Sequence, residues 1–270
     1  MIQEKPKKFA QDYTTKELIA SFICNTMEDG LTVMVGAGIP VPRAGILLAH
    51  LTHGPNMKVS ISMTKTNLFY ERDLKSFEFT ADYRGSIYGE GYFIHNESFD
   101  DLKFRKNLVF FCGGLQFDKY GNSNLVGIGK DYKHLNFRGP GGVGVGDMCA
   151  FCKWYYLYTT SHDKRIFVES VDYITCFGWG EGGADARKKL GLPGGGPRYC
   201  ITPLCIMDFE EKTKRMRLKS VHPGVTVDEV VKNTGFELII PEQVPTTEPP
   251  TEGEIEILRT RIDLDGVLRK

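Results

Sequence analysis

Short apolar runs separated by polar turns open the chain and predict its first structural unit. The run "LTVMVGAG" (31–38) is typical of a buried strand that ends in glycines. The apolar residues of 44–51 predict a helix, and 57–62 predicts a second strand, because Val59 and Ile61 alternate with serines. The order strand, glycine turn, helix, strand is a βαβ unit, which indicates a parallel sheet covered by helices.

Further strands and helices are predicted along the rest of the chain. A helix over 14–29 is opened by Thr14 or Thr15, with Glu17 in its first turn. The other expected segments are a strand (107–114), two short runs about a Tyr-Gly-Asn turn (115–129), a helix near Met148, one or two strands (165–178), a glycine-rich exposed loop or lid (178–200), a proline-rich connector (241–250) and a C-terminal helix (251–261). We therefore expect an α/β fold with an open, largely parallel sheet flanked by helices, in a single domain over 1–270.

Composition and charge exclude several classes of protein. Hydrophobic residues make up 41% of the 270 residues and charged residues 25%, which is ordinary for a soluble globular chain. Lys and Arg number 34, as do Asp and Glu, so the zero formal charge gives no electrostatic footprint for nucleic acid. The polar N-terminus lacks the apolar core of a signal peptide, and no run approaches the roughly 18 apolar residues of a membrane span. We expect a cytoplasmic protein with no nucleic-acid or membrane partner.

A glycine-rich loop is the first candidate for chemistry. The stretch "RGPGGVGVGD" (138–147) is not a Walker loop, because no Gly-Lys-Ser/Thr ends it, and it lacks the spacing of a dinucleotide fingerprint. Consecutive glycines let backbone N–H groups point at one oxygen, and before a helix N-terminus they suit a developing oxyanion. A flexible loop without any ligand is the alternative.

Cysteine and histidine spacing does not predict a metal site. The seven cysteines are odd in number and scattered, which is not a disulfide framework. The stretch "CAFC" (149–152) has CxxC spacing, but zinc takes about four ligands and no second CxxC or His pair follows. On a helix the two thiols would pack on one face. The six histidines have no ligand spacing, and no GxSxG elbow marks Ser62 as a hydrolase nucleophile. We therefore expect no metal.

Four stretches, in order along the chain, resemble one known family. The stretch "VGAGIPVPRAGILLAHLTHGPNM" is similar to the first glycine turn and helix of the class I coenzyme A transferases, in the beta subunit. The stretch "GGLQFDKYGNSN" resembles that subunit's GA-x-Q-hydrophobic-D-x-x-G-N-x-N segment, and "RGPGGVGVGD" resembles its oxyanion loop. The stretch "SVHPGVTVDEVVKNTGFELIIPEQVPTTEPPTEGEIEILRTRID" is similar to its C-terminal region nearly end to end. The resemblance covers residues 30–64 and 107–265.

The resemblance implies a fold, a partner and a set of site residues. The fold would be of the glutaconate CoA-transferase type, and the partner would be a homologous alpha subunit in a two-plus-two heterotetramer. The substrate would be an acyl-CoA thioester, with no permanently bound cofactor. Backbone amides of Gly141 and Gly142 would hold the substrate oxygen. The predicted substrate-binding residues are Gly113, Gly114, Gln116, Asn122, Asn124 and Arg138.

One catalytic position departs from the family pattern. In the transferases a glutamate at the end of an early strand attacks the acyl-CoA. Counting from Pro55, that position falls on Ser62, and no glutamate occurs between Glu28 and Glu71. A serine hydroxyl is not ionised near neutral pH, so it cannot replace the carboxylate. The transferase reaction is therefore not implied by the resemblance alone.

Three functions are compatible with this departure. Heteromeric hydrolases of the family lack the glutamate and open steroid rings, cleaving a C–C bond of a cyclic β-keto acyl-CoA with water and an alpha-subunit base. The stretches "YGEGYFIHNESFDDLKFRKNLVFFCGGLQFDKYGNSN" and "RIFVESVDYITCFG" resemble these hydrolases more than the transferases, and Ser62 would then line the pocket. A transferase that uses Glu71 or Glu78, and a non-catalytic supporting subunit, are the alternatives. Family decarboxylases use a cysteine there, and this chain has none between Cys24 and Cys112.

Overall fold

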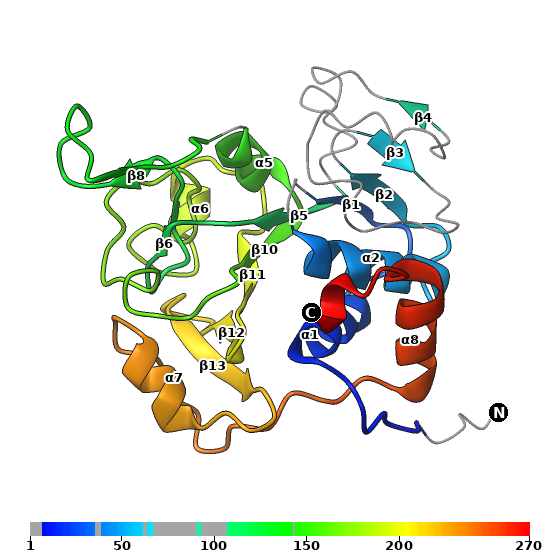
Figure 1. Cartoon of the computed structure of the whole chain (residues 1–270). Coiled ribbons are helices and arrows are strands. Elements are labelled where there is room, and N and C mark those ends of the chain that lie inside the picture. Colours follow the sequence, from blue (N-terminus) through cyan, green and yellow to red (C-terminus); the bar gives the residue numbers. More distant parts are fainter. Residues whose placement is uncertain (1–6, 36–38, 62–63, 67–90, 93–106, 143) are drawn as a thin grey trace. The chain divides into compact units, whose positions relative to one another are not determined.

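Two compact units make up the computed structural model of the chain. The first comprises Met1–Ile94 together with Glu248–Lys270, and the second comprises His95–Thr247. The residues that the structure describes are 7–35, 39–61, 64–66, 91–92, 107–142 and 144–270 (Figure 1). The single domain expected over 1–270 stays a prediction.

The first unit is a short set of strands accompanied by helices. Its elements are α1 (Thr15–Asn25), β1 (Thr32–Val35), α2 (Pro40–Leu51), β2 (Lys58–Ile61), β3 (Thr64–Thr66), β4 (Gly91–Tyr92), α8 (Glu252–Ile257), the π-helical turn η3 (Leu258–Ile262) and the 3-10 turn η4 (Val267–Arg269). Strands β1 and β2 are parallel, with Val33 opposite Val59, whereas β3 and β4 continue antiparallel. The predicted βαβ unit is therefore confirmed.

Local sequence decides where the first two helices begin. The Thr14 side chain accepts a hydrogen bond from the Glu17 N–H, and the Glu17 carboxylate accepts one from the Thr14 N–H, which is a capping box. Helix α1 ends at Asn25, four residues before the predicted end. Helix α2 starts at Pro40, four residues before the predicted start, because proline is tolerated in the first helical turn.

A buried ion pair ties the C-terminal segment to α1. Arg259 donates two hydrogen bonds to the Glu17 carboxylate, at 2.8 and 3.0 Å, and Glu17 is fully buried. Burial alone would raise the pKa of Glu17, but hydrogen bonds from Arg259 and Thr14 outweigh it and lower the pKa. Residues 241–250 contain no helix, and a capping box at Thr251 opens α8, so the predicted connector and C-terminal helix are confirmed.

The second unit contains the longer strands. Its elements are β5 (Leu108–Cys112), β6 (Gln116–Phe117), β7 (Ser123–Asn124), β8 (Gly127–Ile128), β9 (Phe137–Arg138), α5 (Val145–Phe151), β10 (Trp154–Tyr158), α6 (Ala186–Lys189), β11 (Pro197–Ile201), β12 (Cys205–Phe209), β13 (Met216–Val221) and α7 (Val227–Asn233). The strand order is β13-β12-β11-β10-β5, with β5, β10 and β11 parallel and β12 and β13 antiparallel. Two-residue ribbons pair β6 with β7 and β8 with β9. The α/β class with an open sheet and flanking helices is confirmed.

The core of the second unit forms around β5 and β10. Every residue of β5 is buried, as is most of β10, which is typical of parallel strands covered on both faces. The ring of Tyr156 stacks with Phe111 and with Tyr199, at centroid distances of 4.9 and 5.8 Å. The buried hydroxyl of Tyr155 donates to the Phe177 carbonyl at 2.9 Å. Among the described residues, no helix is both long enough and apolar enough to cross a membrane.

Two predicted segments of the second unit differ from the structure. Residues 165–178 form no regular strand, and only Phe167 and Cys176 make isolated bridges there. Their backbone groups bond to β6 and β7 only at isolated points, at Phe117 and at Ser123, so no continuous ladder forms and the apolar alternation reflects single side chains that pack inward. Residues 178–200 are not a loop throughout, because they contain α6 and most of β11.

We expect Gly45→Ala to destabilise the first unit. A Cβ at Gly45 in α2 would lie 2.7 Å from the Ala20 carbonyl oxygen and 2.7 Å from Ile23 Cβ, both in α1. The free energy of unfolding should fall by about 1–3 kcal/mol, although alanine is about 1 kcal/mol better than glycine in a helix interior. Urea unfolding measures the change. Gly253→Ala in α8 is the matched control, because its Cβ would meet nothing within 4 Å. An equal loss at both glycines would contradict the packing argument.

We expect His162 to make the stability of the second unit depend on pH. Burial lowers the pKa of His162 to about 4, against a raising effect of Asp163, and the ring nitrogens bond to the hydroxyls of Thr202 and Thr234. Because the folded pKa lies below the ordinary 6.5, the unfolded chain binds more protons between these values. Stability should therefore fall as the pH drops from 6.5 to 4, by up to about 3 kcal/mol.

The measurement is urea unfolding at several pH values. His162→Gln should flatten the acid slope, because a glutamine side chain takes up no proton in this pH range. An unaltered slope in His162→Gln would show that the His162 ring does not carry the effect.

Candidate active site

Four segments of the second unit converge around the glycine loop. Leu115 donates its N–H to the Asn124 carbonyl at 2.7 Å, and Leu125 donates to the Thr175 hydroxyl at 2.8 Å. Gly141 donates to the Leu125 carbonyl at 2.9 Å. Four segments therefore lie side by side: the one after β5, the one that spans β7 and β8, the one before α5, and the one around Thr175.

Asn124 and Gln116 hold this region together from inside. The buried Asn124 amide donates to the Gln116 side chain at 2.8 Å and to the Gly127 carbonyl at 2.7 Å, and its oxygen accepts from the N–H groups of Val126 and Gly127. Gln116 donates to the Asp172 carboxylate at 3.3 Å and accepts from the Asp172 N–H. Protein partners occupy both amides, so any contribution to ligand binding would be one of positioning.

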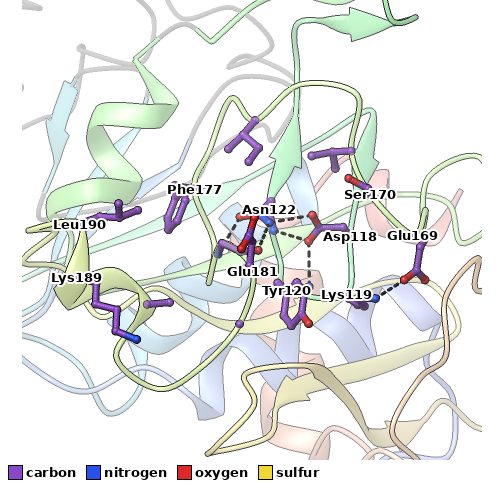
Figure 2. Close-up of a pocket in the computed structure, with 15 residues that line it drawn as sticks. Asp118, Lys119, Tyr120, Asn122, Glu169, Ser170, Phe177, Glu181, Lys189 and Leu190 are labelled. Atoms are coloured by element: carbon purple, nitrogen blue, oxygen red, sulfur yellow. Dashed lines mark hydrogen bonds and ion pairs between the residues drawn. The ribbon is translucent and has the colours of Figure 1, made fainter.

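Asn122 organises the neighbouring turn in the same way (Figure 2). Its nitrogen donates to the Asp118 carboxylate and to the Gly180 carbonyl, each at 2.8 Å, and its oxygen accepts from the N–H groups of Gly178 and Gly180. Burial raises the pKa of Asp118, although hydrogen bonds from Asn122 and from the Tyr120 N–H oppose the shift. Asn122 thus joins the turn after β6 to the glycine-rich segment that precedes α6.

The two predicted oxyanion donors in the glycine loop differ in the hydrogen bonds that their N–H groups make within the described part of the chain. Gly141 has a φ of +86°, which favours glycine, and its N–H is used by the Leu125 carbonyl. The donor role predicted for Gly141 therefore requires this hydrogen bond to break. The Gly142 N–H has no acceptor among the residues that the structure describes. A Cβ on Gly142 would lie 3.2 Å from the Thr175 methyl group, so Gly142 is closely packed.

The other predicted substrate-binding residues lie in two places. Gly113 and Gly114 follow β5, and a Cβ on Gly114 would lie 2.7 Å from the Phe117 ring, whereas one on Gly113 would come no closer than 4.0 Å to its nearest neighbour. Arg138 is exposed on β9, with its guanidinium 5.5 Å from the centre of the Tyr132 ring. Gly113 and Arg138 are therefore open to a ligand, and Gly114 is required by packing.

Ser62 lies outside the described residues, as do the alternative nucleophiles Glu71 and Glu78. The structure describes β2 up to Ile61, one residue before Ser62. Because β2 is parallel to β1, Ser62 follows the carboxyl end of a parallel strand. Ligands of open α/β sheets bind at that edge.

A cavity of about 780 Å³ lies beside Asn122 (Figure 2). Its size is typical of small-molecule sites. The apolar part of its lining is formed by Val171, Ile174, Phe177 and Leu190. Two of its lysines are ion-paired, Lys119 with Glu169 and Lys189 with Asp185. These pairs leave little positive charge to attract phosphate groups, and the glycine loop does not line the cavity.

Sequence patterns do not single out Thr175, Asp172 or Arg187, yet all three bind neighbouring segments. Asp172 accepts from the Gly129 N–H at 2.9 Å, in addition to its contacts with Gln116. The buried guanidinium of Arg187 donates to the carbonyls of Cys149, Ala150, Phe177, Gly178 and Gly194. The sequence offered one indication of these three residues. Each is a polar residue in a strand-like or glycine-rich segment, and a polar side chain buried in such a segment requires a partner.

Comparison with known proteins assigns the family. Residues 16–233 match the family model for coenzyme A transferase. The chain is 33% identical to the B-type subunit of glutaconate CoA-transferase from Acidaminococcus fermentans, over 93% of each chain. It is 35% identical to the B-type subunit of 3-oxoadipate CoA-transferase from Pseudomonas knackmussii, over 92% of each. The crystal structure of the Acidaminococcus enzyme matches with a TM-score of 0.81 at 29% identity, over 97% of this chain and 99% of that one.

These matches and the glycine-bearing loops define an α/β subunit of the type that handles CoA thioesters. The chain belongs to the coenzyme A transferase family, and its relatives are B-type subunits of enzymes with more than one kind of subunit. The predicted family and fold are therefore confirmed.

Similarity to hydrolases of the family is lower. The chain is 25% identical to the cholesterol ring-cleaving hydrolase IpdB subunit of Mycobacterium tuberculosis, over 93% of this chain and 95% of that one. From the stretches 88–124 and 165–178, the sequence predicted that the chain is more similar to the hydrolases than to the transferases. Over the whole chain the two transferase subunits are the more similar, so two segments were too little sequence to rank the relatives.

We expect Gly142→Ala to slow acyl-CoA turnover by about tenfold to a hundredfold, because the added methyl group must displace the Gly142 amide or Thr175. Steady-state kcat measures the loss. Thr175→Ser removes the opposing methyl group and keeps the hydroxyl that binds Leu125, so the double variant should recover most of the rate. Full activity of Gly142→Ala would remove Gly142 from the site.

Proposed function

We propose that this chain is the B-type subunit of a heteromeric enzyme that hydrolyses a C–C bond in a cyclic β-keto acyl-CoA. The observation that carries the proposal is the absence of any aspartate or glutamate from residue 30 to residue 70. This stretch contains β1, α2 and β2, and by resemblance it should end in the nucleophilic glutamate of the transferases. Without a carboxylate, the covalent step of acyl transfer has no nucleophile there, and water becomes the acceptor.

In the proposed reaction, hydroxide formed from water adds to the ring ketone. The bond between the ketone carbon and the α-carbon then breaks, and its electron pair moves to the α-carbon as a thioester enolate. The enolate takes up a proton, so one water is consumed and the product carries a new carboxylate while CoA stays attached. The base that activates the water would come from the alpha subunit.

The role of this chain would be to stabilise the oxygen that becomes negative. The Gly142 amide is the best donor, because it has no acceptor among the described residues and the Gly142 carbonyl is bound by the Val145 N–H at 2.7 Å. Gly113 gives the substrate room, because a ligand can approach its backbone without meeting a side chain. Ser62 would line the pocket in place of the glutamate.

An alpha-type partner in a two-plus-two assembly is part of the proposal. Support comes from the names of the relatives, which are all subunits of heteromeric enzymes. The site would then be completed by the partner, since this chain supplies backbone donors and no carboxylate at the expected strand end.

A second candidate is a CoA transferase for a small carboxylic acid. It is favoured by the 33% and 35% identities to two transferase subunits. Its nucleophile would have to be Glu71 or Glu78. A supporting subunit without a catalytic role is a third possibility, in which Gly142→Ala would alter assembly but not rate.

The test is turnover of a cyclic β-keto acyl-CoA by the co-purified complex in H2(18)O, followed by mass spectrometry of the product. We expect the acyl-CoA to be consumed without any added carboxylic acid, and one heavy oxygen to enter the new carboxylate while CoA remains esterified. Borohydride treatment during turnover should leave the mass of this chain unchanged.

Two outcomes would contradict the proposal. Consumption that requires a carboxylic acid acceptor, with a borohydride-reduced glutamate on this chain, would establish the transferase. Release of free CoA with heavy oxygen in the acid would establish simple thioester hydrolysis. The matched control is the complex that contains the Ser62→Ala variant of this chain. It should keep its turnover, because the Ser62 hydroxyl is not the nucleophile in the proposed reaction.

A further inference from the structure

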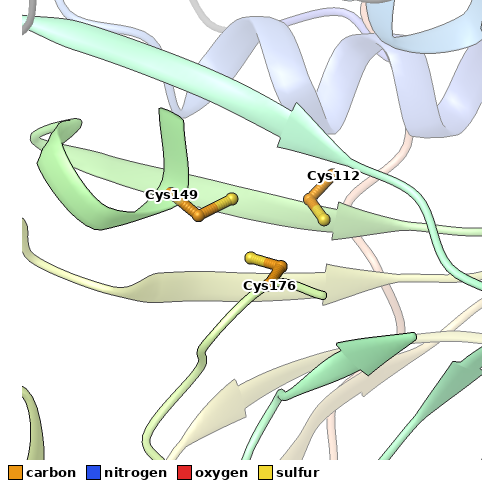
Figure 3. A group of neighbouring side chains, drawn as sticks. All are labelled: Cys112, Cys149 and Cys176. Carbon is orange, nitrogen blue, oxygen red and sulfur yellow. The ribbon is translucent and has the colours of Figure 1, made fainter. Parts of the chain in front are cut away.

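Three cysteine side chains from separate parts of the sequence meet in the core of the second unit (Figure 3). Cys112 ends β5, Cys149 lies in α5, and Cys176 lies in the irregular segment that follows residue 165. All three are fully buried, and their sulfur atoms lie within 4.8 Å of one another. Cys152, the other half of the CxxC pair, is buried but does not belong to this group.

The surroundings of the three thiols favour a soft cation over a hard one. Among the described residues, no carboxylate or imidazole joins the group, so its ligand set is sulfur alone. The nearest oxygen contacts of Cys112 are the Ser123 hydroxyl at 3.3 Å and the Gly113 carbonyl at 3.2 Å. Thiolate sulfur selects ions such as Cu(I), whereas zinc in structural sites takes four ligands.

The spacing of the sulfur atoms suits a three-coordinate ion. With metal–sulfur bonds of about 2.3 Å, three sulfurs at the corners of a triangle lie about 4.0 Å apart. The present separations of up to 4.8 Å would have to shorten by less than an ångström. Small rotations of the side chains can supply that change, without a movement of the backbone.

A buried positive charge binds the backbone beside two of the three cysteines. Arg187 donates to the carbonyl of Cys149 at 2.6 Å and to the carbonyl of Phe177, the residue after Cys176, at 2.7 Å. Within the described part of the chain its donors go to carbonyls, and no carboxylate pairs with it. A cluster of thiolates around one monovalent cation is anionic, so the Arg187 guanidinium would compensate its charge.

We propose that Cys112, Cys149 and Cys176 form a three-thiolate site for a single Cu(I) ion or a similar soft d10 cation. Each thiol that binds as a thiolate releases its proton, and the ion does not change its oxidation state. The bound ion would join the end of β5, helix α5 and the segment of Thr175, which are the elements that carry Gly113, the glycine loop and its packing partner. The proposal does not depend on the proposed function.

The experiment is an anaerobic titration of the full-length, reduced protein with Cu(I) held by a competing bathocuproine chelator. We expect one equivalent of Cu(I) to transfer to the protein, with ultraviolet thiolate-to-copper absorption and a copper–sulfur distance of about 2.3 Å by X-ray absorption. Cys149→Ala and Cys176→Ala should each weaken binding by about a hundredfold or more. Circular dichroism shows whether these variants fold.

Cys24→Ala and Cys200→Ala are the matched controls, because both residues are equally buried but outside the group. They should keep the full equivalent of Cu(I). Less than a tenth of an equivalent bound to the folded native protein would overturn the proposal. An equal loss of Cu(I) binding in the two control variants would also overturn the proposal. It would mean that binding does not depend on the cluster of Cys112, Cys149 and Cys176.

Discussion

The second unit depends on side-chain amides that replace the hydrogen bonds of a sheet. Buried backbone N–H and C=O groups require partners, and between β5 and α5 the chain has only two-residue strands. Asn122 and Asn124 provide these partners, and Gln116 extends the network to Asp172. The network holds glycine-rich turns that have few side chains to pack. A backbone amide stabilises a developing charge only if it is held in place beforehand, and the network contributes by fixing the turn beside Leu125, whose carbonyl binds Gly141.

In the proposed enzyme, the residue that follows β2 in sequence would decide which group attacks the acyl-CoA. A glutamate at that position would make the enzyme itself the first acceptor, and without it water would be the acceptor. In both reactions negative charge develops on a carbonyl oxygen of the substrate, so the same proposed backbone donor would suit either one. This explains how the chain can be 33% identical to a transferase subunit and still lack the carboxylate on which that chemistry depends. Family membership constrains the fold and the substrate class more strongly than it constrains the acceptor.

The core of the second unit contains two unusual features near the glycine-rich loops, the buried guanidinium of Arg187 and the three cysteine thiols. A guanidinium that binds five carbonyls fixes the segment before β11 against α5. Removal of the guanidinium would leave these buried carbonyls without a donor, so Arg187 also has a structural role. Because it binds the carbonyls of Cys149 and Phe177, it would also lie near enough to the proposed thiolate site to offset part of its negative charge. The glycine loop is bound to Leu125 through the Gly141 amide, and it leads into α5, which carries Cys149 of the cluster.

The sequence by itself determined the βαβ unit, the helix starts at Thr14 and Thr251, and the family, because each is encoded by local periodicity, by a capping pair or by a contiguous motif. It misjudged 165–178, because alternating apolar residues also occur where single side chains of an irregular segment pack inward. Tertiary structure alone decided that the Gly141 amide is bonded to Leu125 while the Gly142 amide finds no acceptor in the described part of the chain, since this depends on which carbonyl is packed opposite each one. The meeting of Cys112, Cys149 and Cys176 was likewise decided by the fold, because residues so far apart in sequence become neighbours only when their strand, helix and loop pack together.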